Sequence, residues 1–202
     1  MSNSPRARLN NVTAKNVRGP YPSGQCFQFA RSDDTSLTNF YCLNEAENSW
    51  VEDTISAWRS SNVVIKHGLI DGNNANTGIC LMYEGSSHET HGGLFEDIDA
   101  VHCQGCFSGY PSNGLVMRGV TCANSWCDGT FRGIKRGGKF NLFNFGNNEV
   151  DKVYTKNNIV EDSFYQDDCP YTKLLWTAKD TPDAVKKFEV TRLETFTPRE
   201  PL

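Results

Sequence analysis

The chain has 202 residues, of which 38% are hydrophobic and 22% are charged, a composition typical of one globular domain. It carries a formal net charge of −4 without a concentrated basic stretch, which argues against nucleic acid as a partner. No apolar run reaches the length of a membrane span, and the opening residues show no signal peptide. Seventeen glycines and many asparagines instead favour short strands joined by tight turns.

Five short segments resemble one another along the chain and predict a repeat. Their apolar anchors are separated by 28, 24, 28 and 24 residues and are Phe27, Ile55, Ile79, Phe107 and Phe131. Fifteen residues after the first four anchors, a second position is always apolar: Cys42, Ile70, Leu94 and Cys122. Residues at equal phase in stacked parallel strands lie about 4.8 Å apart, so each set is expected to form an interior column.

A repeat of this length predicts an all-β fold, a single-stranded right-handed parallel β-helix of about six to seven rungs. A β-sandwich also contains many short strands, but its strands need not recur in register. We expect one domain over residues 1–202. The repeat is clearest over residues 7–165, and residues 166–202 are expected to form an irregular return strand and tail. No capping helix precedes residue 7, so a partner or a further segment is expected to cover that end.

Three segments carry a resemblance to a known family. They are Gly24-Gln-Cys-Phe-Gln-Phe29, Glu52-Asp-Thr-Ile-Ser-Ala-Trp58 and Ser60-Ser-Asn-Val-Val-Ile-Lys-His-Gly-Leu-Ile-Asp-Gly-Asn-Asn74. All three resemble the repeats of pectin-lyase-like parallel β-helix proteins. The resemblance implies the fold, which hosts lyases, hydrolases, epimerases and non-catalytic binders. The Gly-His-Gly motif of polygalacturonases and the Asp-Pro-His motif of alginate epimerases are absent, so no specific enzyme family is matched.

The eight cysteines predict one disulfide and no metal site. Cys103 and Cys127 each lie four residues before an anchor, so equal phase on adjacent rungs predicts that they form a disulfide. Cys42 and Cys122 fall in the second interior column, where a free thiol packs as a small hydrophobe. A disulfide favours an oxidising compartment, and we expect an extracellular or cell-surface location.

The longest loop after a predicted strand runs from Glu84 to Gly93 and contains His88 and His91. The spacing of these two histidines does not fit the helical motif of zinc hydrolases. Loops on a rigid scaffold often carry function, so both are candidates for substrate binding. We expect no metal and no cofactor, with Ca²⁺ as the one alternative left open.

Outward-facing aromatic residues predict a strip for stacking sugar rings. Alternation along the strands places Trp58 and Tyr110 on one face, with Tyr83 beside them, although packing under a loop would use the same residues. Hydrolysis needs two carboxyl groups, and the pairs within reach are Asp53 with Glu84 and Glu84 with Asp128. β-Elimination from a uronic acid needs a base and a cation, for which the candidates are His102, Arg132 and Lys135.

These features predict an extracellular or surface protein that acts on a polysaccharide, with an acidic one among the candidates, by lyase or hydrolase chemistry at the aromatic strip. The alternative is a non-catalytic β-helix module for glycan binding, adhesion or assembly. An enzyme should bring two titratable groups together in a cleft, whereas a binder should present a flat aromatic face. Neither nucleic acid nor membrane insertion is expected.

Overall fold

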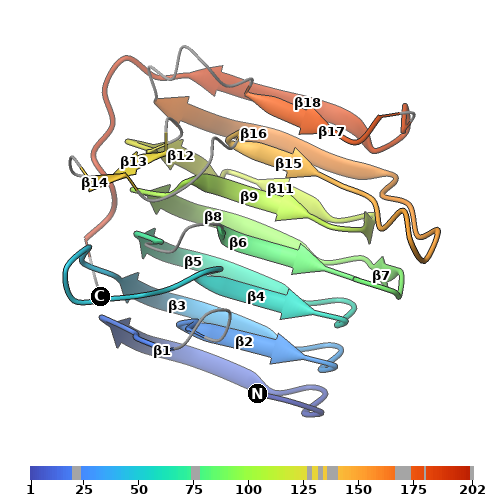
Figure 1. Ribbon diagram of the computed structural model, residues 1–202, viewed down its shortest axis with the longest axis horizontal. Helices are drawn as coiled ribbons and strands as arrows, with labels where there is room; N and C mark the ends of the chain where they lie inside the picture. The colour runs from blue at the N-terminus through green and yellow to red at the C-terminus, as the bar shows by residue number, and fades with distance from the viewer. Residues whose placement is uncertain are drawn as a thin grey trace.

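The computed structural model describes residues 1–19, 24–73, 78–126, 129–131, 134–135, 141–166, 174–179 and 181–200. Every helix or strand element in these ranges is a β-strand. The long strands are parallel and stack as a β-solenoid of about six turns, as Figure 1 shows. The sequence-based prediction of a parallel β-helix is therefore confirmed.

The first of the two large sheets has six short strands, each contributed by a different coil of the solenoid. In stacking order its strands are β2 (Phe27–Ala30), β4 (Ile55–Trp58), β6 (Ile79–Glu84), β9 (Gly105–Gly109), β15 (Phe143–Phe145) and β17 (Leu175–Thr177).

The second large sheet has eight strands and forms the other side of each coil. Its strands are β1 (Arg8–Lys15), β3 (Ser36–Leu43), β5 (Val64–Asp71), β8 (Leu94–Val101), β11 (Val116–Arg118), β12 (Thr121–Ala123), β16 (Asn158–Gln166) and β18 (Val185–Arg192). β11 and β12 lie end to end between β8 and β16. Two small pairs complete the fold: β7 (Thr90–His91) with β10 (Ser112–Asn113), and β13 (Thr130–Phe131) with β14 (Ile134–Lys135).

The interior column of the first sheet differs from the predicted one at two positions. Strand pairing joins Phe27, Ile55, Leu81, Phe107 and Phe143 in sequence. Leu81 replaces the expected Ile79, because the step along the chain from Ile55 is 26 residues and not the expected 24. Phe131 was also predicted wrongly, since it lies in the antiparallel pair β13–β14. Corners of unequal length, rather than the strands, break the period.

The second interior column contains one error of the same kind. Cys42 pairs with Ile70, Ile70 with Ala100, and Ala100 with Cys122. The predicted Leu94 instead starts β8 and pairs with Val64. The long loop between β6 and β8 adds residues before β8, so the residue at the expected distance falls at the beginning of that strand.

A column of left-handed residues bends the second sheet at the same place in successive coils. Their φ angles lie between 48° and 60°, a region in which asparagine, aspartate and glycine are enriched. The column consists of Asn11, Asn39, His67, Asp97, Gly119 and Asp162. The bend gives each coil two shorter faces on this side, and it separates β11 from β12.

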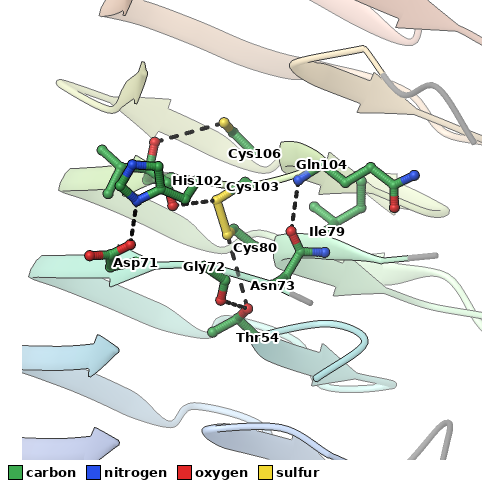
Figure 2. The surroundings of a disulfide bond; sticks show 12 residues. Thr54, Asp71, Gly72, Asn73, Ile79, Cys80, His102, Cys103, Gln104 and Cys106 are labelled. Atoms are coloured by element: carbon green, nitrogen blue, oxygen red, sulfur yellow. Dashed lines mark hydrogen bonds and ion pairs between the residues drawn. A yellow bond between two sulfur atoms is a disulfide. The ribbon is translucent and has the colours of Figure 1, made fainter. Parts of the chain in front are cut away.

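Three disulfides cross-link the described part of the solenoid: Cys26–Cys42, Cys80–Cys103 and Cys106–Cys122. Cys80 lies in β6 and Cys103 in the corner after β8, with 5.7 Å between their Cα atoms (Figure 2). The predicted Cys103–Cys127 bond is therefore wrong. Its phase was counted from Phe131, which is not part of the ladder, and Cys127 lies outside the described residues. Cys42 and Cys122 are likewise disulfide-bonded and are not free thiols.

The C-terminal tail folds back over the outer face of the second sheet. After β18 it descends along the stack toward β3 (Figure 1). Phe196 packs against a small cluster that includes Leu69 and Val101. The Arg199 guanidinium then donates to carboxylate oxygens of Asp97 and Asp99, at 2.7 and 2.9 Å. This outer face is thus partly covered by the chain itself.

Candidate functional site

The outer face of the first sheet presents two rows of side chains. Because side chains alternate along a strand, the neighbours of the interior column point outward. One row consists of Gln28, Ser56, Met82, Ser108, Asn144 and Trp176. The other row contains Ala30, Trp58 and Glu84, and Tyr110 and Gly146 continue it. Polar and aromatic groups of successive coils therefore lie side by side along one face.

An open hollow of about 470 Å³ lies over β2, β4 and β6 on this face. Its lining residues, which we call the acidic hollow, are Gln25, Gln28, Ala30, Glu52, Asp53, Ser56, Trp58 and Glu84. Glu52 and Asp53 belong to the corner that precedes β4, whereas Glu84 ends β6. Two neighbouring coils therefore bring three carboxyl groups to one hollow.

Hydrogen bonds to the next coil fix the corner that carries two of these carboxyl groups. The Asp53 Oδ1 accepts a hydrogen bond of 2.8 Å from the backbone N–H of Ile79. The Thr54 hydroxyl donates to the carbonyl of Gly72, at 3.0 Å (Figure 2). As a result Asp53 is held with only 7% of its surface exposed. Its carboxyl group is positioned by the backbone and not by a cation.

Burial shifts the titration of all three carboxyl groups in the same direction. Burial raises the pKa of Asp53 to about 8, the Ile79 N–H opposes this rise, and the charges of Glu52 and Glu84 add to it. Burial and the Glu52 charge also raise the pKa of Glu84, while Arg59 lowers it. Burial raises the pKa of Glu52. Burial thus favours the protonated form of Asp53 at neutral pH in a hollow that it shares with two further carboxyl groups, as a site that pairs an acid with a base requires.

Trp58 forms one wall of the acidic hollow and is held by two arginines. The guanidinium carbons of Arg31 and Arg59 lie 5.1 and 4.4 Å from the centre of its ring system. Arg59 also donates to the hydroxyl of Ser87, at 2.5 Å. Cation–π contacts of this kind restrict the orientation of the indole ring, which lines the same hollow as the carboxyl groups.

A second hollow, of about 350 Å³, continues along the same face toward the C-terminal coils. Its lining, which we call the aromatic groove, comprises Ile79, Met82, Ser108, Tyr110, Asn141, Asn144, Gly146 and Trp176. Tyr110 and Trp176 are 38% and 43% exposed, unusual for large aromatic side chains. A Cβ atom at Gly146 would lie 2.3 Å from the Tyr110 ring, so only glycine lets that ring lie flat against β15. None of these eight residues carries a formal charge at neutral pH.

The loop between β6 and β8 forms a third hollow, on the far side of Trp58. It measures about 400 Å³ and is lined by Arg31, Asp33, Arg59, Ser61, His88, Glu89 and Thr90. The predicted His88 is therefore near the site but outside the acidic hollow. His91 lies in β7, where its ring faces the amide of Asn113 at 3.4 Å.

The structure brings together some of the predicted site residues. Asp53, Glu84 and Trp58 line the acidic hollow, and Tyr110 lies further along the same face. The prediction that Tyr83 belongs to an exposed strip is wrong, because that side chain is fully buried in the core. Tyr83 pairs with Ala57 and Gly109 and lies two residues after the interior Leu81, so alternation along β6 points its side chain inward.

Two further predicted residues, His102 and Lys135, do not line the acidic hollow. The His102 Nδ1 lies 2.6 Å from the Asp71 carboxylate in another corner (Figure 2). Lys135 is exposed in β14. Asp128 and Arg132 lie outside the described residues, so the predicted pair of Glu84 with Asp128 stays a prediction.

Sequence reasoning missed Trp176, Asn144 and the two arginines around Trp58. Arg59 follows Trp58 directly, and Arg31 occupies the same phase one coil earlier, so equal phase alone could have found the second arginine. Trp176 could have been found from Leu174-Leu175-Trp176, where an exposed aromatic residue follows an inward-facing leucine. Among the described residues, no three His, Cys, Asp or Glu side chains are grouped so that they could hold a metal ion.

The fold and the site together define a parallel β-solenoid with a carboxyl-lined hollow and an aromatic groove on one outer face. Comparisons with family models, with curated proteins and with solved structures find no match for this chain. The described residues include no helix long and apolar enough to cross a membrane. The three disulfides favour an oxidising environment.

Proposed function

We propose that this protein acts outside the cell on a polysaccharide and hydrolyses glycosidic bonds at the acidic hollow. The observation that carries the proposal is the buried Asp53, whose pKa is raised to about 8 in an open hollow that it shares with Glu52 and Glu84. Glycoside hydrolysis needs a protonated carboxyl group to donate to the leaving oxygen and a second carboxylate to activate water or attack the sugar. Structural carboxyl groups are normally paired with cations, whereas Asp53 has no cationic partner among the residues that the structure describes.

In this proposal Asp53 is the proton donor and Glu84 is the second carboxyl group. Burial and like charges keep the Asp53 proton in place at neutral pH, and Arg59 favours the ionised form of Glu84. Trp58, held by its two arginines, offers a flat face for the sugar next to the cleaved bond. Elimination from a uronic acid is less well supported, because no cation lines the acidic hollow among the described residues.

A non-catalytic glycan-binding module is the second candidate. The aromatic groove favours it, because Tyr110 and Trp176 offer stacking surfaces on coils away from the carboxyl groups. The two candidates share a face but differ in what Asp53 must do.

The test is to incubate the wild-type protein with neutral and acidic polysaccharides and to measure new reducing ends and the absorbance of unsaturated products. Hydrolysis releases reducing ends without unsaturated products. Loss of this release in Asp53→Asn, with sugar binding kept, would support the hydrolase. Binding of a polysaccharide by the wild type without any release would favour the binding module.

A further inference from the structure

The acidic hollow and the aromatic groove form one continuous surface. Ser56 lines the first and Met82 lines the second, and these two residues pair directly between β4 and β6. A fourth hollow, of about 780 Å³, extends the groove past Tyr110 and Trp176 to Tyr154, which is 46% exposed. A polymer lying along the stack would meet the carboxyl groups first and the aromatic residues on later coils.

The charge of this surface restricts what the polymer can be. Among the described residues, three acidic residues and no cation line the acidic hollow, and the eight residues of the aromatic groove are uncharged. The hollow beyond the groove adds one charge of each sign, Glu149 and Lys179. Arg31 and Arg59 are stacked on Trp58 and line a different hollow. A polyuronate or a sulfated glycan would place anions against Glu52 and Glu84, which like-charge repulsion disfavours. A neutral sugar avoids this repulsion.

The chemistry of the groove fits a neutral pyranose. Tyr110 and Trp176 offer flat surfaces for the apolar faces of sugar rings. The side chain of Asn144, whose Nδ2 donates to the Asn141 carbonyl at 2.7 Å, and the hydroxyl of Ser108 offer hydrogen-bonding groups for hydroxyls at the ring edge. Such a mixture of aromatic surface and neutral polar groups is typical of a site that fixes an uncharged polar ligand.

From these observations we infer that the aromatic groove is a binding subsite for neutral pyranose residues of a polysaccharide whose cleavage point lies at the acidic hollow. The inference rests on the proposed function for the position of the cleavage point. Glu84 in β6 and Trp176 in β17 are three strand spacings apart, about 14 Å or roughly three pyranose residues. The protein should therefore prefer neutral chains that extend about three residues beyond the bond that is cut.

The experiment measures binding and cleavage separately. Titration calorimetry with the Asp53→Asn variant follows binding of neutral β-1,4- and α-1,4-linked oligosaccharides of increasing length, with polygalacturonate and alginate as acidic probes. We expect at least one neutral series to bind, with affinity rising until the chain can reach Trp176. Trp176→Ala and Tyr110→Ala, added to this variant, should each weaken binding of the long chains about five- to thirty-fold. Trp176→Phe keeps a flat ring and should retain most of the affinity.

Three outcomes would overturn the inference: tighter binding of the acidic probes than of every neutral series, no binding of any neutral series, or unchanged affinity in both alanine variants. Both side chains are exposed, so the variants should fold, and thermal unfolding checks this. If neutral chains bind at the groove but the wild type does not cut them, the hydrolase proposal fails and the inference stands. If the wild type cuts neutral chains but Trp176→Ala has the same kcat/KM on long and short chains, the inference fails and the hydrolase stands.

Discussion

The two outer faces of the solenoid treat their charged residues in opposite ways. On the second sheet, charges of opposite sign alternate from coil to coil: Lys66 with Glu96, Arg118 with Glu161, and Arg199 with Asp97 and Asp99. On the first sheet, three carboxyl groups line one hollow. Burial raises the pKa of all three, and the charge of Glu52 adds to the rise for Asp53 and Glu84.

This difference separates residues that stabilise the folded state from residues whose burial destabilises it. A ladder of ion pairs satisfies each charge and needs no further ligand. A buried carboxyl group without a cation is unfavourable for the folded state, and such groups cluster at functional sites. The contrast between the paired face and the unpaired face is therefore the best guide to where the chemistry lies, and four predictions test it.

The largest effect is expected from Asp53→Asn on activity. If Asp53 donates a proton, its removal should lower the rate of polysaccharide hydrolysis about 10²- to 10⁴-fold, as measured by the release of reducing ends. Glu96→Gln makes the same replacement of a carboxyl group by an amide on the paired face and should leave the rate unchanged. Equal losses in the two variants would remove the distinction between the faces.

The same substitution should change how stability depends on pH. The folded-state pKa of Asp53 is raised from 3.8 to about 8, so the folded state holds this proton more tightly than the unfolded state. The free energy of unfolding of the wild type should therefore fall as pH rises from about 4 to about 8, by a few kcal/mol. Asparagine cannot ionise and keeps the bond to the Ile79 N–H, so Asp53→Asn should be more stable than the wild type at about pH 8. Urea unfolding across this range measures both slopes, and parallel slopes would contradict the shifted pKa.

A smaller effect is expected where the tail crosses the paired face. The hydrogen bond from Arg199 is the main reason that the pKa of Asp97 is lowered to about 2. The stabilisation is present above the unfolded-state value near 3.8 and is lost as pH falls toward 2. Arg199→Ala should lower the free energy of unfolding at neutral pH by about 1 kcal/mol, since both side chains are partly exposed and screened. Denaturant unfolding measures this change, which should shrink at high salt, and hydrolysis should be unaffected.

The smallest effect is expected for an ordinary rung of the ion-pair ladder. Lys66 and Glu96 lie 2.9 Å apart and are both partly exposed. Lys66→Ala should change the free energy of unfolding by about 0–1 kcal/mol and should not change activity. A large loss of activity in this variant would place part of the site on the second sheet.

Strand content and side-chain alternation could be read from the sequence, whereas the lengths of the corners could not. Within a strand the period of two is set by backbone geometry, so Gln28, Ser56 and Ser108 point outward as expected. Between strands, corners differ in length, which moved the ladder from Ile79 to Leu81. Tyr83 is buried because alternation turns it inward together with Leu81, so it should not have been placed in the exposed strip. The same uncertainty produced the wrong disulfide partner for Cys103.

The acidic hollow was partly predictable because two of its members lie at the ends of adjacent strands. Asp53 and Glu84 could be placed within reach of each other from rung spacing alone. Which carboxyl group keeps its proton could not be predicted, since that depends on burial and on the Ile79 N–H. Trp176 was missed because the repeat weakens in the sequence after residue 165, although β17 and β18 continue both sheets.

The disulfides also bear on how the chain matures. In the described residues each bond joins cysteines that are neighbours in chain order, and the separations are only 16, 23 and 16 residues. No bond encloses or crosses another. During synthesis, which starts at the N-terminus, each of these disulfides can therefore form before the next pair of thiols has been made. At every step the native partner is then the nearest cysteine in the chain and the fastest to react. Oxidation can therefore proceed coil by coil during synthesis with little need for an isomerase.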